Sequence, residues 1–268
     1  MAMFDVRQAD LAKLNSLTKY PSIPTYHVLD EGNGSLGEDH VAFDGRVLAT
    51  EKVDGTNSRV ICLPDGSYLL GSREELLYAR GDLIGNPSMG IVAAMKDKAD
   101  ELRGRAPDRV RVFFCEFYGG AVTANSRQYT GERRAGFRLF DVAEIEDYAA
   151  VLDRPAAAIA AWRDGGGQRY LAEDDLRQLA AASGLELTPR VAELDAGALP
   201  GSLVDGLAFL QRTITKSGCV LDDKAGGRPE GLVVRTPDRR VIAKLRFQDY
   251  ERTLKRREKD AGSGRRKE

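Results

Sequence analysis

The sequence predicts an α+β fold, in which antiparallel sheets carry flanking helices and one helical insert. Strand-like runs follow one another through short turns in the first half of the chain. Residues 147–215 then become rich in Ala and Leu with helical spacing, and strand character returns after them. Strands and helices therefore do not alternate regularly, as they would in a doubly wound fold.

The bulk composition is that of an ordinary globular protein. The 268 residues include 40 Lys and Arg against 41 Asp and Glu, so a surface for a polyanion must come from segregated charge. Three cysteines without CxxC spacing argue against a disulfide framework or a zinc site and indicate a reducing compartment. No apolar run has the length of a signal peptide or membrane span, so we expect a soluble, cytoplasmic protein without membrane contact.

The first half of the chain is expected to hold most of the strands. Residues 5–17 predict a short amphipathic helix, and Asn86-Pro87 is expected to open a second helix because proline suits the first helical position. Asp54-Gly55 breaks one strand, and Pro64-Asp65-Gly66 makes a hairpin turn. The expected strands lie at residues 47–53, 58–63, 67–71, 110–118 and 137–142.

The second half closes with a hairpin and a charged helix. A helix near residues 173–183 should end at Gly184. Strands at 231–236 and 240–247 are joined by Pro237-Asp238-Arg239, and the charged segment 248–260 looks helical. The expected domains are therefore residues 1–247, with the insert at about 147–215, and a charged helix and tail at 248–268. The basic residues of that tail either touch phosphates or are simply solvated.

The sharpest local feature is the heptapeptide EKVDGTN at residues 51–57. Lys52 ends an apolar strand, and Gly55 lets the backbone approach a phosphate closely. A lysine attacks phosphorus only as a neutral amine, which burial and neighbouring cations favour. Asp54 could hydrogen-bond a ribose hydroxyl or help place a metal-bound water. On these residues alone, a strand-end lysine in an ordinary Asp-Gly turn is an equally good interpretation.

Two buried-looking strands carry further candidates. Glu116 lies within VFFCEFYGG, where a carboxylate is costly unless it has a polar partner. Alternation along FRLFDV places Phe140 on the opposite face from Asp141, where its ring could stack on a purine or simply fill the core.

The closing hairpin adds an acid and two cations. Glu230 stands at a strand start before a glycine. Lys244 and Arg246 share one face of an otherwise apolar strand, which suggests a phosphate clamp.

Together these blocks resemble the covalent nucleotidyltransferases, which comprise ATP-dependent RNA and DNA ligases and mRNA capping enzymes. The EKxDGTN form, with Asn57, is most similar to the RNA ligases that include nick-sealing and RNA-editing ligases. The resemblance extends over residues 19–247 and implies a nucleotidyltransferase (ATP-grasp-like) fold. The matching blocks, in the family's order, are the nucleophile motif at 51–57, the ribose-binding acidic motif at 115–119, the purine-stacking motif at 137–142, the metal-linked acidic motif at 230–233 and the closing cationic motif at 244–246.

The resemblance implies a role for each matching residue. Lys52 would attack ATP and carry AMP, assisted by Lys244 at the α-phosphate and by Arg246. Glu230 would help place Mg²⁺ or Mn²⁺. The remaining ATP-binding candidates are Glu51 and Phe140 for adenine, Glu116 for ribose, Asp54, Gly55 and Asn57 from the nucleophile motif, Arg73 for phosphate or an RNA 3′ end, and Arg59 as a weaker candidate.

The implied reaction joins an RNA 5′-phosphate to a 3′-hydroxyl, using ATP, in RNA repair. Two features depart from the family pattern: Arg246 stands where RNA ligases usually have lysine, and the chain ends about twenty residues after the last motif. We therefore expect RNA to be bound by the catalytic domain alone or with a protein partner that adds RNA-binding surface. The alternatives are a GTP-dependent capping-type guanylyltransferase, a DNA ligase, and a non-catalytic module that binds a nucleotide or an RNA end.

Overall fold

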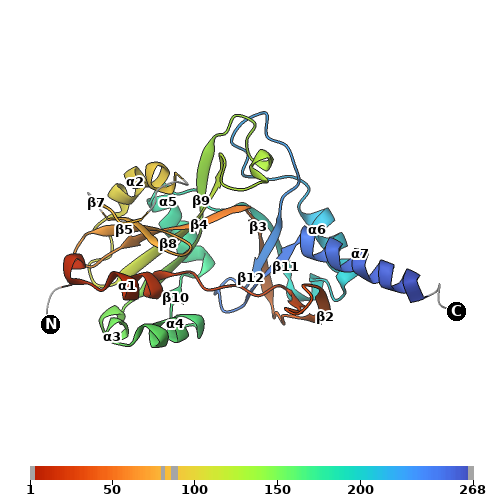
Figure 1. The fold of residues 1–268 in the computed structure, drawn as a ribbon, viewed down its shortest axis with the longest axis horizontal. Coiled ribbons are helices and arrows are strands. Elements are labelled where there is room, and N and C mark those ends of the chain that lie inside the picture. Colours follow the sequence, from red (N-terminus) through yellow and green to blue (C-terminus); the bar gives the residue numbers. More distant parts are fainter. Residues whose placement is uncertain (1–3, 80–81, 86–89, 265–268) are drawn as a thin grey trace.

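Two antiparallel β-sheets organise the chain (Figure 1). The computed structural model describes residues 4–79, 82–85 and 90–264. Within these residues the strand order is β10-β9-β8-β4-β5-β6-β7 in what we call the large sheet and β11-β3-β12-β13 in the small sheet, and β1 and β2 form a separate hairpin. The predicted α+β fold of antiparallel sheets with flanking helices is therefore confirmed.

The strands follow the expected turns closely. The large sheet consists of β4 (Gly55–Cys62), β5 (Tyr68–Ser72), β6 (Leu76–Ala79), β7 (Asp82–Leu83), β8 (Val110–Gly119), β9 (Ala135–Ile145) and β10 (Arg169–Tyr170). The small sheet consists of β3 (Arg46–Lys52), β11 (Arg190–Asp195), β12 (Gly231–Arg235) and β13 (Ile242–Arg246), and the hairpin of β1 (His27–Leu29) and β2 (Leu36–His40).

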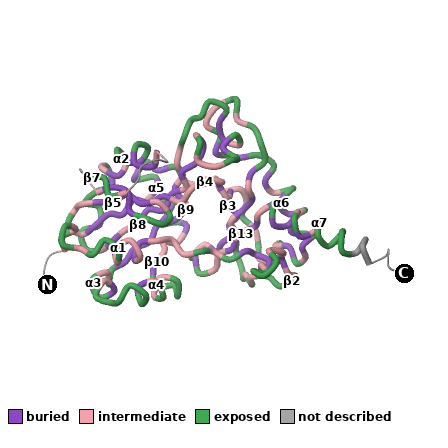
Figure 2. The backbone as a smooth tube through the Cα atoms, in the orientation of Figure 1, coloured by how far each residue is buried: buried purple, intermediate pink, exposed green. Residues whose placement is uncertain are grey.

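Helices cover both faces of the large sheet. One face packs against α2 (Ile91–Leu102) and α5 (Glu173–Ala182), and the other against α1 (Leu11–Thr18), α3 (Tyr148–Leu152) and α4 (Ala156–Asp164). Successive strand residues therefore point into two different cores, and Figure 2 shows the buried segments concentrated in the central strands.

The small sheet is covered by α6 (Leu203–Thr213) and α7 (Phe247–Gly264). Phe209 and Tyr250 pack with Leu245 of β13 in this core. Gly206 makes the packing of α6 on α7 possible, because a Cβ there would lie 2.3 Å from the Tyr250 ring. The charged helix expected at 248–260 is thus present, and its first turn belongs to the core of the small sheet.

Two expectations for the first hundred residues need correction or qualification. The helix expected over residues 5–17 is divided into a 3-10 turn at Val6–Gln8 and α1, because Asp10 caps a new helix by accepting the N–H groups of Ala12 and Lys13 at 3.0 and 3.1 Å. The start expected at Asn86-Pro87 lies outside the described residues; the described helix, α2, follows Gly90.

The segment 147–215 combines the expected helices with two short strands that the sequence did not indicate. It contains α3, α4, α5 and α6, but also β10 and β11. β10 pairs with β9 in the large sheet, and β11 pairs with β3 in the small sheet. The segment therefore also completes one edge of each sheet. Local helical spacing could not reveal these strands, because their partners lie far away in the sequence.

Candidate nucleotide site

A cavity of about 300 Å³ lies where the two sheets meet. Both sheets contribute to it, because β3 ends at Lys52 in the small sheet and the chain then crosses to begin β4 at Gly55 in the large sheet. Most residues singled out in the sequence line this cavity, and they are Glu51, Lys52, Gly55, Asn57, Arg73, Glu116, Phe140, Lys244 and Arg246.

Lys52 reaches the cavity from the end of β3. Its Nζ donates to Oε2 of Glu230 at 2.5 Å, and the two side chains are only 24% and 20% exposed. Gly231, the residue after Glu230, pairs with Lys52 across the β3–β12 ladder. The strand register therefore holds the acid opposite the lysine.

Glu116 enters the site from β8 in the large sheet. Lys52 and the backbone N–H of Gly55 are the polar neighbours that favour its ionised form. Burial raises the pKa of Glu116 to about 7, although the positive charge of Lys52 opposes the shift. Burial also raises the pKa of Glu230, again opposed by Lys52.

Lys244 and Arg246 lie on the same face of β13, as predicted, and both line the cavity. Burial lowers the pKa of Lys244, and the charges of Arg246 and Lys52 lower it further. Arg246 donates two hydrogen bonds to Asp249 of α7, at 2.7 and 3.1 Å, which fix its guanidinium group beside the cavity. Lys52, Lys244 and Arg246 together form a group of cations that could bind a chain of phosphates.

Arg73 lies at the rim of the cavity. Its side chain is 61% exposed, and its contacts with Ser22 and Glu74 are long, at 3.4 Å each. Such weak contacts leave the guanidinium group able to turn toward a ligand.

Phe140 faces the cavity, but not through simple strand alternation. The β8–β9 ladder shifts register here, so that Phe114 lies opposite Asp141 while the next residue of β8 lies opposite Leu139. Phe140 is the extra residue of a β-bulge, and both Phe140 and Asp141 line the cavity. The prediction that they lie on opposite faces is wrong. Tyr20 packs edge-on against the Phe140 ring, with 4.9 Å between centroids.

Three residues expected to bind ATP or its metal ion do not line the cavity. Glu230 is one of them, although it bonds to Lys52, which does line it. The other two are Asp54 and Arg59. The carboxylate of Asp54 accepts a hydrogen bond from Asn125 at 2.7 Å, and its backbone N–H donates to the Tyr129 hydroxyl at 2.6 Å. Arg59 is fully buried, where its guanidinium group donates to Asn15 of α1 and burial lowers its pKa to about 9. These positions argue against direct contact of either side chain with a nucleotide in this conformation.

Asn57 and Glu51 line the cavity in different ways. Within the described part of the chain, Oδ1 of Asn57 is buried without a hydrogen-bond partner, so it is available to a donor on a ligand. The carboxylate of Glu51 is already used: it accepts from the Ser217 hydroxyl at 2.5 Å and from the backbone N–H of Gly218 at 2.8 Å.

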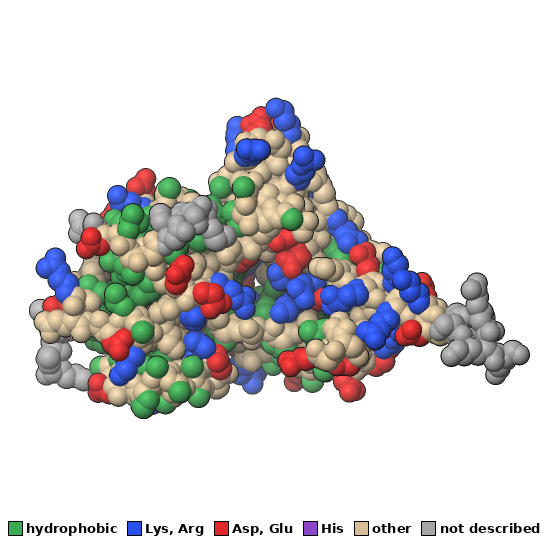
Figure 3. Space-filling view, in the orientation of Figure 1, with side chains coloured by type: hydrophobic (Ala, Val, Ile, Leu, Met, Phe, Trp, Pro, Cys, Tyr) green, Lys and Arg blue, Asp and Glu red, His purple; other side chains and the backbone are tan. Residues whose placement is uncertain are grey.

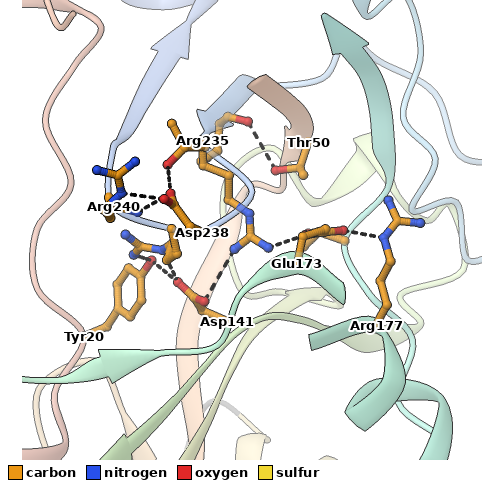
Figure 4. Close-up of polar contacts among 12 residues, drawn as sticks. Tyr20, Thr50, Asp141, Glu173, Arg177, Arg235, Asp238 and Arg240 are labelled. Carbon is orange, nitrogen blue, oxygen red and sulfur yellow. Dashed lines mark hydrogen bonds and ion pairs between the residues drawn. The ribbon is translucent and has the colours of Figure 1, made fainter. Parts of the chain in front are cut away.

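A network of buried charged side chains lies beside the cavity (Figure 4), and the sequence motifs did not predict it. Arg235 of β12 donates to Asp141 of β9 at 3.4 Å and also to Glu173 at the start of α5. Arg239 donates to Asp141 at 2.6 Å, and so does the Tyr20 hydroxyl at 2.9 Å. The signal that could have revealed it is Arg235 itself, a charge that ends the apolar run GLVV.

The described residues meet neither the requirements of a metal-binding cluster of side chains nor those of a membrane-spanning helix. Across residues 4–79, 82–85 and 90–264, no three or more His, Cys, Asp or Glu side chains are grouped so that they could hold a metal ion. None of the helices described in those ranges combines the length and apolar character that crossing a membrane requires.

Known structures share this architecture at low sequence identity. A mutant of Naegleria gruberi RNA ligase without ligand matches with a TM-score of 0.55 and 14% identity, over 90% of this chain and 62% of that one. The same enzyme with pyrophosphate matches with a TM-score of 0.54 and 16% identity, over 79% of this chain and 52% of that one. A mutant of it with ATP and Mn matches with a TM-score of 0.53 and 16% identity, over 77% of this chain and 50% of that one. This chain thus spans half to three-fifths of those structures.

No curated protein sequence matches the chain. The family model described as RNA ligase, in contrast, matches residues 45–255, which include every motif from Lys52 to Arg246. The chain belongs to the RNA ligase family.

Proposed function

We propose that this chain is an ATP-dependent RNA ligase that carries AMP on Lys52. The observation that carries the proposal is the meeting of Lys52 with buried acids and with Lys244 and Arg246 at the junction of the two sheets. Membership of the RNA ligase family supports it, and the N. gruberi RNA ligases of the same fold have been solved with ATP, AMP and Mn.

Each part of ATP has a candidate partner in the cavity. The Phe140 ring would stack on adenine beside the Glu51 backbone, and Glu116 would bind the ribose hydroxyls. Lys244, Arg246 and, after reorientation, Arg73 would hold the phosphates.

In the first step Nζ of Lys52 bonds to the α-phosphorus, and the bond from that phosphorus to the bridging oxygen breaks, releasing pyrophosphate. The ammonium group must first lose a proton, and Glu230 is the proposed acceptor because it already receives a hydrogen bond from Nζ. An RNA 5′-phosphate oxygen then attacks the same phosphorus, the P–N bond breaks, and AMP passes to the RNA. Finally a 3′-hydroxyl attacks the activated 5′-phosphorus, loses its proton and releases AMP.

A divalent ion, Mg²⁺ or Mn²⁺, fits this residue set as a companion of ATP. Mg²⁺ is usually held by one or two carboxylates together with substrate phosphates, and not by a protein cage. Glu230, which bonds to Lys52, would supply such a carboxylate beside the proposed phosphate site. When bound, the ion would neutralise charge that builds on the phosphoryl oxygens.

The wider setting is also part of the proposal. We take residues 1–247 as the nucleotidyltransferase domain, because both sheets contribute to the cavity, and residues 248–268 as an accessory helix and tail. Joining 5′-phosphate and 3′-hydroxyl ends serves RNA repair. Cys62, Cys115 and Cys219 are free and buried, which fits a reducing compartment such as the cytoplasm.

The test is covalent labelling. Incubation with Mg²⁺ and ATP radiolabelled at the α-phosphate should label the chain, and Lys52→Ala should abolish the label because it removes the proposed nucleophile. Lys96→Ala, on the exposed face of α2, is the matched control and should label normally. Labelling by GTP in place of ATP would indicate a guanylyltransferase, and tight ATP binding without label would indicate a non-catalytic module. A Lys52→Ala protein that still accepts AMP would refute the proposal.

A further inference from the structure

A protruding lobe stands over the junction of the two sheets (Figure 1, top centre). We define the lobe as residues 119–136 and 216–229. These segments are far apart in the sequence but are bonded together: the Asp222 carboxylate accepts the N–H groups of Gly131 and Glu132 at 2.9 and 3.2 Å, as well as the Thr130 hydroxyl. Gly131 allows this approach, because a Cβ there would lie 2.4 Å from Cβ of Lys224. Hydrogen bonds between its two segments therefore hold the lobe in a defined shape.

The lobe is basic, although the whole chain has a net charge of −1. Two of its acids already have partners within the lobe. Asp222 joins the two segments, and Glu132 pairs with Arg134 and Lys224 at 3.2 and 3.1 Å. The space-filling view shows basic side chains gathered at its crest (Figure 3). Its cations are Arg127, Arg133, Arg134, Lys216, Lys224 and Arg228, against the acids Glu132, Asp222 and Asp223.

Arg127 and Arg133 are the arginines of the lobe most available to a partner. Both are exposed, and within the described residues neither side chain has an ion pair or hydrogen bond. Arg228, in contrast, pairs with Glu251 of α7 and lies over the Phe247 ring. Unpaired guanidinium groups on a rigid support bind phosphate groups well, because no internal ion pair must be broken first.

The base of the lobe is fastened to the turn that follows Lys52. Asn125 and Tyr129 bond to the side chain and to the backbone N–H of Asp54, at 2.7 and 2.6 Å. Tyr129 also belongs to a small core with Val53 and Cys219. A ligand on the lobe would therefore lie on an element that is directly attached to the nucleophile turn.

We propose that the lobe holds the RNA strand next to the reacting 5′ end through its phosphates, with Arg127 and Arg133 as the main contacts. This inference rests on the proposed RNA ligase function. Contacts to phosphates fix the position of a nucleic-acid strand but do not depend on its base sequence. The lobe would therefore set where a strand lies without selecting its bases. Segregated charge of this kind is how a chain with no net positive charge can attract RNA.

The test compares two double variants with the same change of charge. Arg127→Ala/Arg133→Ala removes the lobe contacts, and Arg103→Ala/Arg154→Ala removes two exposed arginines without side-chain partners among the described residues, at the ends of α2 and α3. Affinity for a 5′-phosphorylated RNA should fall at least about fivefold at 0.1 M salt in the lobe variant only. The slope of log affinity against log salt should decrease by about 0.7–0.9 for each lost contact.

Two further readouts separate this inference from the proposed function. Lysyl-AMP formation with ATP alone should be the same in both double variants, because the lobe cations do not line the ATP cavity. Arg127→Lys/Arg133→Lys should restore most of the RNA affinity, which a purely structural role would not explain. Equal affinity and salt slope in the lobe and control variants would overturn the inference, even in a protein that forms lysyl-AMP. A wild-type protein that binds RNA through the lobe but forms no lysyl-AMP would overturn the proposed function alone.

Discussion

At the scale of single residues, Glu116 shows how burial sets the chemistry of the site. Its carboxyl group lies on an apolar strand, close to the charges of Lys52, Glu230 and Asp54. Burial disfavours the ionised form more strongly than Lys52 favours it, so the pKa of Glu116 rises to about 7. The folded protein therefore keeps a proton on Glu116 at pH values where the unfolded chain has lost it.

This proton gives a testable pH dependence. Because the folded pKa is raised from 4.5, the stabilising protonated state is fully present below pH 4.5 and is lost as the pH rises toward 7. Glu116→Gln keeps the shape but cannot ionise. We expect it to be about 1–3 kcal/mol more stable than the wild type at pH 8, and we expect the gain to shrink toward pH 4.5. Urea unfolding across this pH range measures the difference. Glu31→Gln, on an exposed turn, is the control, and an equal gain there would contradict the explanation.

At the scale of elements, the crossing from β3 to β4 depends on one close backbone contact. A Cβ at Gly55 would lie 2.3 Å from the carbonyl oxygen of Phe117 and 3.0 Å from Cγ of Glu116. We expect Gly55→Ala to force β4 away from β8, to cost about 1–3 kcal/mol of stability, and to slow lysyl-AMP formation. Thermal unfolding and ATP labelling measure the two effects. Gly201→Ala, where an added Cβ meets nothing within 4 Å, should change neither.

The same scale shows what the sequence could and could not predict. The strand break at Asp54-Gly55 and the paired cations on β13 were predictable, because they follow from local turn chemistry and period-two alternation. The bulge that turns Phe140 was not, because an extra residue is defined only by the partner strand. The burial of Arg59 likewise depends on Asn15, from a distant helix. Local sequence patterns therefore predicted the strands and turns, whereas the bulge at Phe140 and the burial of Arg59 depend on partners that are distant in the sequence.

At the scale of the whole molecule, the two sheets are joined by buried charges as well as by the chain itself. Glu173, at the start of α5, accepts hydrogen bonds from Arg190 of β11 at 2.9 and 3.1 Å and also bonds to Arg235 of β12. Burial alone would raise the pKa of Glu173, but Arg190 and Arg235 outweigh it and lower this pKa to about 2. Arg235 connects this acid to Asp141 of β9, so a single guanidinium group links the large sheet, the small sheet and α5 at the cavity between the sheets.

Removing that link should therefore destabilise the whole protein and not just one sheet. Arg235 is 3% exposed, and Arg235→Met fills its volume but leaves part of the charge on Asp141 and Glu173 uncompensated. Breaking a buried ion pair in this way costs about 3–5 kcal/mol. Arg240, whose side chain is 82% exposed and pairs with Asp238, is the matched control, and Arg240→Met should cost less than about 1 kcal/mol. Urea unfolding of both variants at neutral pH measures the difference. Similar losses from the two substitutions would mean that the network adds nothing beyond a surface ion pair, and that apolar packing alone holds the sheets at the angle that forms the cavity.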